Sequence, residues 1–415
     1  MRLAVFTNKF PHKVSTFFAR DMRALIDAGF DIDIFPFYPC DADLWRYVPS
    51  LLDERILPRT KIHHISIAEG LSLPRQAPWK KISTFVKDTV AISTSAVKYG
   101  ILPVSKSMYV CLKAWAWALR NHTRYDHVLA YWGNYAATCA YIFNHLLESP
   151  IPFSMFLHAG VDLYADQVYL REKLIYADNI IVVCDFNRRF LQTEFADIYP
   201  IISEKIHLYH LGLDLSIFSY QPNHRPMSKI LAVGALEKYK GYEFLLSAVQ
   251  ELRRRGIYCE VELVGDGKEA ERLKRLAEQL SISENVQFTG WLSPKAVRAE
   301  MQNATVLAHP SNGLGDAVPT VIKECMAVGT PVVASNTAGI PELLNYGKCG
   351  ILVPPRNVLA LADALEKLLT NEQLRLSYAE KARIFAELKF DLWQNGKELA
   401  NLIMLTDRSR SLSLA

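Results

Sequence analysis

Two acidic side chains, Asp316 and Glu324, bracket the start of a predicted helix. An apolar run before them predicts a buried strand, a loop with two glycines follows, and the helix is expected over residues 319–328. The backbone amides of Ala317 and Val318 lie beside Asp316, where the positive end of the helix dipole favours an anion. We therefore predict a site for a phosphate-bearing ligand with a carboxylate on either side.

A second loop, between a predicted strand at 229–233 and a predicted helix, carries Gly234, Lys238 and Lys240. Glycine allows a ligand to approach the backbone closely, and the two lysines have the charge to neutralise a diphosphate. Lysine-bearing loops between a strand and a helix are common, so this prediction depends on the Asp316 segment in the same half of the chain.

His158 directly follows a predicted buried strand at 153–157. In a parallel sheet the carboxyl ends of the strands face the ligand crevice, so this histidine is a candidate catalytic side chain. The alternative is a histidine whose ring is satisfied by backbone groups. Asp185 and Asp214 also follow apolar stretches, but capping a helix is the more common role for an aspartate there.

Several common enzyme motifs are missing from the sequence. No Gly-x-Gly-x-x-Gly follows the first predicted strand, which disfavours a nicotinamide dehydrogenase, and no P-loop of ATPases is present. No Gly-x-Ser-x-Gly elbow supports a serine nucleophile. The seven cysteines are scattered without a Cys-x-x-Cys pair, so neither a disulfide framework nor a zinc site is expected, and a reducing cytoplasm fits best.

Strands and helices alternate along both halves of the chain, which predicts an α/β protein with two doubly wound, Rossmann-like parallel sheets. A chain of 415 residues has room for two domains. We predict an N-terminal domain over 1–210 and a C-terminal domain over 227–385, with a polar, proline-bearing linker at 221–226. The segment 386–415 is expected to be a helix that packs back on the N-terminal domain. Two such sheets facing a central cleft would hold ligands at their strand ends.

The net charge of +4 is too small to indicate nucleic-acid binding, but the charge is unevenly distributed. Residues 71–124 hold nine lysines and arginines, interleaved with aromatic residues, against the single acid Asp88. This pattern is typical of helices in the interface of an anionic membrane. The alternative is a set of amphipathic helices that pack on a sheet with their lysines in water. No apolar run is long enough to span a membrane, so we expect a cytoplasmic protein, either free or peripheral on the inner-membrane surface.

An ordered set of motifs covers nearly the whole chain and resembles the family 4 retaining glycosyltransferases of the GT-B fold. In the second half the set comprises Gly234 through Gly241, Leu263–Gly267, Phe288–Gly290, Pro310-Ser311, Asp316–Pro319, Glu324–Ala327, Gly329–Val332, Gly339–Glu342 and Gly350–Pro354. In the first half, the segments that resemble the exopolysaccharide (colanic-acid-type) branch are Phe10-Pro11, Thr16-Phe17, His158 and Gly212–Asp214.

The resemblance implies transfer of a sugar from a UDP- or GDP-linked donor to a glycan or lipid-linked glycan in cell-surface polysaccharide biosynthesis. Asp316 stands where the family contacts the transferred sugar, and Glu324 stands where it holds the ribose. Lys240 stands where it binds the diphosphate, assisted by the amides of Ala317 and Val318. The C-terminal domain is then the donor-binding domain.

On the N-terminal, acceptor-binding side, the resemblance assigns His158 to the sugar or the reacting centre. Phe10, Pro11 and Thr16 belong to the acceptor-side loop. In this class the leaving diphosphate helps to deprotonate the acceptor, so no protein nucleophile, metal or cofactor is expected. Catalysis then rests on alignment and on stabilising the departing negative charge.

Three positions depart from the family pattern. Ala235 replaces the usual arginine, for which Lys238 is a substitute cation. Asp316 replaces a glutamate and is one methylene shorter. Asp162 follows His158 one residue later than usual, and we assign it no role. These departures leave the identity of the donor open, and Ala235 keeps open a catalytically degenerate glycosyltransferase-like subunit. A GT-B sugar-nucleotide epimerase, which would share the fold, is a second alternative.

Overall fold

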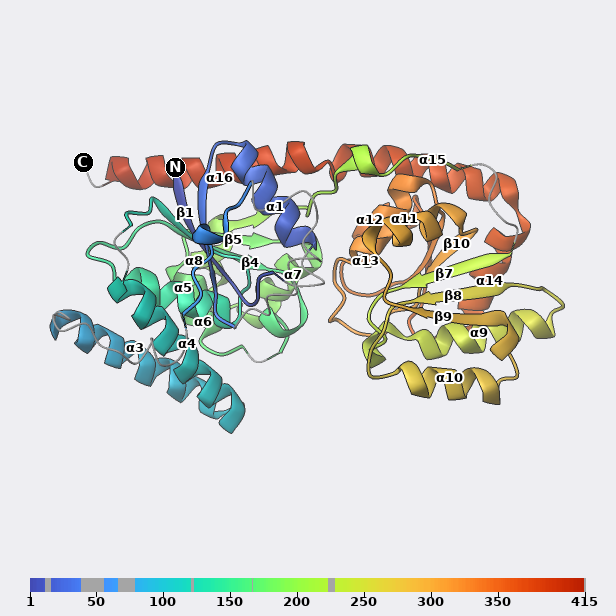
Figure 1. Cartoon of the computed structure of the whole chain (residues 1–415), viewed down its shortest axis with the longest axis horizontal. Coiled ribbons are helices and arrows are strands. Elements are labelled where there is room, and N and C mark those ends of the chain that lie inside the picture. The colour runs from blue at the N-terminus through green and yellow to red at the C-terminus, as the bar shows by residue number, and fades with distance from the viewer. Residues whose placement is uncertain are drawn as a thin grey trace. The chain divides into compact units, whose positions relative to one another are not determined.

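The computed structural model describes residues 1–11, 16–38, 56–65, 79–120, 123–165, 167–222 and 228–413. These residues form two compact units (Figure 1). Unit 1 combines Met1–Gly212 with Leu392–Ala415, and unit 2 is the continuous stretch Leu213–Asp391.

Unit 1 contains a six-stranded sheet in the order β2-β1-β3-β4-β5-β6, with every neighbouring pair parallel. Because β2 lies on one side of β1 and β3 on the other, the strand order reverses between β1 and β3. The strands are β1 (Arg2–Thr7), β2 (Asp31–Pro36), β3 (His127–Ala130), β4 (Phe153–Leu157), β5 (Asn179–Val182) and β6 (Ile206–Leu208). The helices are α1 (Thr16–Asp27), α3 (Trp79–Val97), α4 (Ile101–Arg120), α5 (Tyr135–His145), α6 (Leu170–Tyr176), α7 (Asp185–Glu194), α8 (Tyr199–Ile202) and α16 (Leu392–Ser413).

Unit 2 also contains a six-stranded parallel sheet, in the order β12-β11-β10-β7-β8-β9. Its first strand, β7, lies between β8 and β10, so the order reverses between β7 and β10. The strands are β7 (Lys229–Val233), β8 (Glu260–Val264), β9 (Val286–Gly290), β10 (Val306–His309), β11 (Val332–Ser335) and β12 (Ile351–Val353). The helices are α9 (Tyr242–Arg254), α10 (Ala270–Gln279), α11 (Pro294–Asn303), α12 (Thr320–Val328), α13 (Ile340–Leu343), α14 (Val358–Thr370) and α15 (Glu372–Lys389).

The strands predicted at 153–157 and 229–233 are confirmed as β4 and β7. The short apolar runs became strands because both faces of a parallel sheet are covered by helices, so their side chains are buried whichever way they point. The strands β6 and β12, at the edges of their sheets, were not predicted because each has only three residues.

The predicted C-terminal helix from residue 386 is divided in two. Helix α15 ends at Lys389 within unit 2, and α16 begins at Leu392 and packs against α1 of unit 1. A Cβ added at Gly396 of α16 would lie 2.4 Å from Ala24 Cβ of α1, which shows how closely the two helices approach. Of the predicted linker at 221–226, residues from 223 onward lie outside the described residues.

The basic and aromatic segment predicted at 71–124 forms α3 and α4 over its described residues. Both helices bury one face in the hydrophobic core of unit 1. Among the helices that the structure describes, none has the length and apolar character needed to cross a bilayer.

Candidate functional site

The turn after β7 packs directly on the end of β10. Residues Lys238–Lys240 form one turn of 3-10 helix, and Gly241 joins it to α9 with a φ of 69°. A Cβ at Gly241 would lie 2.1 Å from the carbonyl oxygen of Pro310, so only glycine fits there. The amide of Asn312 donates to the carbonyl of Tyr239 at 2.9 Å and joins the two loops further.

A cluster of three polar side chains lies where these loops meet, of which His309 and Asp316 are buried and Lys240 is 11% exposed. Lys240 Nζ is 2.7 Å from Asp316 Oδ2, and His309 Nε2 is 2.6 Å from the same oxygen. The three side chains come from the turn after β7, from the last residue of β10 and from the loop before α12. The structure therefore brings the two predicted residues Lys240 and Asp316 together, with His309 as a third member.

The charges in this cluster follow from its burial and hydrogen bonds. Burial alone would raise the pKa of Asp316, but the charge of Lys240 and the hydrogen bonds from Lys240 and His309 hold that pKa well below its ordinary value. Burial lowers the pKa of His309, despite the neighbouring carboxylate. We therefore assign a charged Asp316 that accepts from a charged Lys240 and from the Nε2–H of a neutral imidazole.

Two buried polar atoms border the cluster without a hydrogen-bond partner among the described residues, His309 Nδ1 and Tyr242 Oη. A Cβ at Gly234 would lie 2.8 Å from Tyr242 Oη and 3.6 Å from Lys240 Nζ, so the glycine leaves the space beside both groups open. Burial raises the pKa of the Tyr242 hydroxyl, which stays protonated and can donate a hydrogen bond. Sequence reasoning assigned no role to His309 or Tyr242.

The other predicted donor-side residues surround this cluster in sequence. Lys238 is exposed at the start of the 3-10 turn. Ala317 is buried, Val318 is half-buried, and both precede Pro319, the N-cap residue of α12. Glu324 is half-buried in the second turn of α12. Within the described ranges, no group of three His, Cys, Asp or Glu side chains is arranged to hold a metal ion.

The place of the cluster agrees with a rule for doubly wound sheets. Ligands bind beyond the carboxyl ends of the strands, at the point where the strand order reverses. In unit 2 the order reverses between β7 and β10, and the cluster is formed by residues that end or follow these two strands. The topology thus makes it the expected ligand site of unit 2.

In unit 1, His158 follows β4 and is buried among aromatic rings. Its ring centroid lies 4.6 Å from that of Trp132 and 5.3 Å from that of Phe17. Its Nε2 lies 2.9 Å from the carbonyl oxygen of Tyr131, the geometry of an Nε2–H donor. The alternative to a catalytic role for His158 is a ring whose nitrogen is satisfied by a backbone group, and the structure contains such a hydrogen bond.

The loop that carries His158 is held by a buried carboxylate. Asp162 accepts from the amides of His158 at 2.8 Å and Ala159 at 2.9 Å, and it also meets the amide of Gly133 at 3.5 Å. Burial raises the pKa of Asp162 to about 6, although these amides oppose the shift. Asp162, which we assigned no role, is therefore a positioning residue for the His158 loop.

A buried lysine holds the neighbouring loop after β3. Lys173 Nζ donates to the carbonyls of Gly133 at 2.9 Å and Asn134 at 3.1 Å, and to Thr138 Oγ1 at 3.1 Å. Burial lowers the pKa of Lys173 to about 7. These three acceptors match the three N–H groups of an ammonium.

The predicted acceptor-side loop follows β1, beside the reversal of strand order between β1 and β3. Phe10 is 1% exposed and its ring packs 5.2 Å from that of Phe18, so it supports this loop from within. Pro11 is buried, and Thr16 is half-buried at the first residue of α1.

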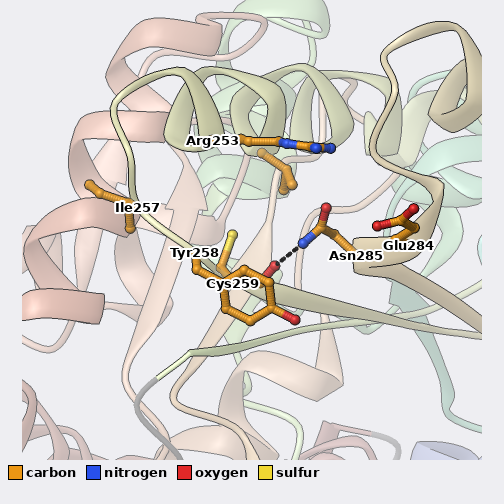
Figure 2. A pocket seen from close by; sticks show the side chains of 7 residues that line it. Arg253, Ile257, Tyr258, Cys259, Glu284 and Asn285 are labelled. Carbon is orange, nitrogen blue, oxygen red and sulfur yellow. Dashed lines mark hydrogen bonds between the residues drawn. The ribbon is translucent and has the colours of Figure 1, made fainter.

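A small cavity lies elsewhere in unit 2. It has a volume of about 110 Å³ and is lined by Arg253, Tyr258, Cys259, Glu284 and Asn285, among others (Figure 2). Because Cys259 precedes β8 and Asn285 precedes β9, this cavity lies at the amino edge of the sheet, opposite the Asp316 cluster. A larger hollow of about 580 Å³ lies between residues 345–349 and α15 and also excludes the cluster.

Comparison with known proteins points to one family. The family model described as glycosyl transferases group 1 matches residues 221–385. The chain is 26% identical to the putative colanic acid biosynthesis glycosyltransferase WcaL of Escherichia coli K12, with 97% of this chain and 99% of WcaL covered. It is 25% identical, with the same coverage, to the amylovoran biosynthesis glycosyltransferase AmsK of Erwinia amylovora.

Solved structures share the fold. HepE from Anabaena, crystallised with UDP, superposes with a TM-score of 0.67 at 16% identity, covering 96% of this chain and 98% of HepE. Together with the two six-stranded parallel sheets, this likeness confirms the predicted GT-B fold class.

Proposed function

We propose a donor, an acceptor class and a mechanism from the premise that the chain, which carries a glycosyl transferases group 1 domain, is a glycosyltransferase. The donor is a UDP- or GDP-linked sugar bound by unit 2. The acceptor is a glycan or lipid-linked glycan bound by unit 1, and the product enters an exopolysaccharide. WcaL and AmsK, which are similar over nearly the whole chain, are both named for exopolysaccharide biosynthesis.

The observation that carries this proposal is the buried pair of Lys240 and Asp316 at the reversal point of the unit 2 sheet. A nucleotide sugar presents both a diphosphate and sugar hydroxyls, and this pair offers a cation and a carboxylate 2.7 Å apart. Lys240 binds the diphosphate, with the amides of Ala317 and Val318 beside it. Asp316 accepts from a hydroxyl of the transferred sugar, and Glu324 from the ribose. Gly234 leaves space for the donor, and Lys238 supplies a second cation.

The proposed reaction retains the configuration of the anomeric carbon. The acceptor hydroxyl oxygen forms its bond to that carbon on the face from which the diphosphate departs. The carbon–oxygen bond to the diphosphate breaks, and the acceptor proton passes to a diphosphate oxygen. Lys240 stabilises the negative charge that develops on the leaving group, so these residues need no metal ion and no protein nucleophile for this step. His158 acts on the reacting sugar, held by the Asp162 loop.

A binding and turnover experiment tests the proposal. Purified protein is screened for thermal stabilisation by UDP, GDP and a panel of their sugars, because only a bound ligand raises the unfolding temperature. The stabilising donor is then incubated with lipid-linked glycans, and proton NMR of the product reports its anomeric configuration. We expect transfer with retention. Inversion would refute the mechanism, and the absence of both transfer and donor hydrolysis would refute the activity.

The same assay separates the two alternatives. An epimerase would convert the free nucleotide sugar without an acceptor. A degenerate subunit, suggested by Ala235 in place of arginine, would bind neither UDP nor GDP in a calorimetric titration. We also propose that the enzyme works at the cytoplasmic face of the membrane, where a lipid-linked acceptor is found.

A further inference from the structure

Helices α3 and α4 form a hairpin at the outside of unit 1. Figure 1 shows α4 between α3 and α5, in agreement with the contacts between these helices. Ile92 and Ala96 of α3, and Val110 and Trp115 of α4, belong to the core of the unit. The hairpin is thus anchored to unit 1 through its inner side.

The outer face of the hairpin is apolar. Six hydrophobic side chains on it are between 50% and 88% exposed, namely Val86, Val90, Val97, Ile101, Leu102 and Met108. The spacing of the three valines keeps them on one side of α3. Ile101 and Leu102 follow Gly100 at the corner between the helices, and Ile101 is the most exposed of the six. A cluster of exposed apolar side chains at one place on a surface indicates an interaction site.

The charge on this face has one sign. Lys87 and Lys98, beside the three valines of α3, are exposed. The single acid of the two helices, Asp88, is buried and lies 3.0 Å from His145 Nδ1 on α5. Over the described residues of α3 and α4, the outer face therefore presents apolar side chains and two exposed lysines, and no exposed carboxylate.

We propose that the outer face of the α3–α4 hairpin docks on an anionic phospholipid bilayer. The interface of such a bilayer offers a partner for each kind of side chain on this face. Its apolar layer accepts the six hydrophobic side chains, and its negative headgroups attract the lysines. A second copy of the chain would bring lysines against lysines, which disfavours a dimer through this face. The helices lie along the interface, with Ile101 and Leu102 inserted at the corner. This deepens the membrane location suggested under the proposed function.

Sedimentation with lipid vesicles tests the docking, without donor or acceptor, so its failure is distinguishable from a failure of sugar transfer. The full chain is expected to bind vesicles of phosphatidylcholine mixed with phosphatidylglycerol, to bind phosphatidylcholine alone weakly, and to be released by salt. Lys87→Glu and Lys98→Glu should each weaken binding by about fivefold or more, since each lysine near an anionic surface contributes about that factor. Ile101→Ser combined with Leu102→Ser should weaken binding at all salt concentrations.

Matched variants control for general effects of surface substitution. Ile201→Ser combined with Leu208→Ser replaces two exposed apolar residues elsewhere in unit 1, and Lys295→Glu with Lys381→Glu reverses two exposed charges in unit 2. Neither should change vesicle binding. The depth of insertion into the bilayer is measured with an environment-sensitive dye attached to Leu102→Cys, and Leu208→Cys is the comparison. Both variants also carry Cys40→Ser, so that the other cysteines present are the six buried ones. A blue shift with anionic vesicles is expected at position 102 alone.

Three outcomes would overturn the proposal. The first is no binding to anionic vesicles at low salt. The second is unchanged binding in the Ile101→Ser, Leu102→Ser variant. The third is self-association in analytical ultracentrifugation that this same variant abolishes, which would make the face a contact between copies of the chain.

Discussion

Lys240 and Asp316 are 76 positions apart in sequence, yet Lys240 Nζ lies 2.7 Å from Asp316 Oδ2 in a largely buried ion pair. The cation that we propose for the donor diphosphate is thus already held by a carboxylate. Asp316 fixes the direction of the lysine side chain, and it also weakens the attraction of that lysine for a second anion. The two residues therefore have separable effects on donor binding and on transfer.

Removing the lysine tests its role in binding. Lys240→Ala should weaken the affinity for UDP or GDP by about ten- to a hundredfold, because a hydrogen bond to a charged group contributes about 1.5–3 kcal/mol. Isothermal titration calorimetry measures this loss. The exposed Lys381 on α15 of the same unit provides the control, and Lys381→Ala should bind like the natural protein. Equal affinities for both variants would contradict the assignment.

Removing the carboxylate charge should have the opposite effect on the nucleotide alone. In Asp316→Asn, Lys240 is no longer neutralised, so UDP or GDP should bind at least as tightly as before. Sugar transfer should nevertheless fall, because the amide accepts a sugar hydroxyl more weakly than the carboxylate does. Calorimetry measures the affinity for the nucleotide, and a turnover assay on the same preparation measures the rate of sugar transfer. Parallel losses of nucleotide binding and transfer would show that Asp316 acts only by holding the site together.

His309 is expected to position Asp316 through its Nε2–H. His309→Phe removes this hydrogen bond and should lower kcat by about tenfold or more, with a smaller change in KM. His309→Gln keeps a donor and should recover part of the rate. A loss of equal size in both variants would indicate that the ring has a packing role instead.

Asp162 predicts a distinctive dependence of stability on pH. Its folded-state pKa of about 6 lies above the ordinary value of 3.8. Between these values the folded chain keeps a proton that the unfolded chain has released, so this contribution to the free energy of unfolding decreases as the pH rises, by up to about 3 kcal/mol in total. Urea unfolding at pH values from about 4 to 6.5, the range set by these two pKa values, measures this change in the free energy of unfolding. The free energy of unfolding of the natural protein minus that of Asp162→Asn should fall as the pH rises. Parallel curves for the two proteins would refute the raised pKa.

Alanine substitutions at two glycines distinguish the cost of a left-handed backbone conformation from the cost of a steric clash. Gly241 and Gly256 both have positive φ, of 69° and 78°. An added Cβ meets Pro310 O at 2.1 Å in the first and nothing within 4 Å in the second. Gly256→Ala should cost about 1–2 kcal/mol for the left-handed conformation, and Gly241→Ala distinctly more, with loss of nucleotide binding. Chemical denaturation compares the two, and equal costs would exclude the close contact.

Much of this site could be predicted because its signals are local. Apolar runs fixed the strand ends, and the glycines and the following helix placed Asp316 in a loop. His309 and Tyr242 were missed because their roles depend on β7 lying beside β10, which is a property of the whole sheet. One signal was available for His309, since it ends a predicted strand seven residues before Asp316.

The alternation of lysines and aromatic residues in 71–124 left two interpretations open for a similar reason. The sequence pattern shows that a helix has two faces, but it does not show which partner each face meets. In the structure, Trp115 and Trp117 turn inward to the core, while Ile101 and Leu102 remain exposed. The packing of the helices and an interaction with lipid are therefore compatible.

The division of unit 1 between the two parts of the chain affects how it is made. Unit 2 is continuous from Leu213 to Asp391 and can fold as soon as it leaves the ribosome. Unit 1 must wait for α16, whose Asn395 donates to the carbonyl of His210 and whose Thr406 pairs with Asn179. The first domain to be synthesised is thus the last to be completed, and a nascent chain stalled before residue 392 carries an unfinished first domain beside a finished second one.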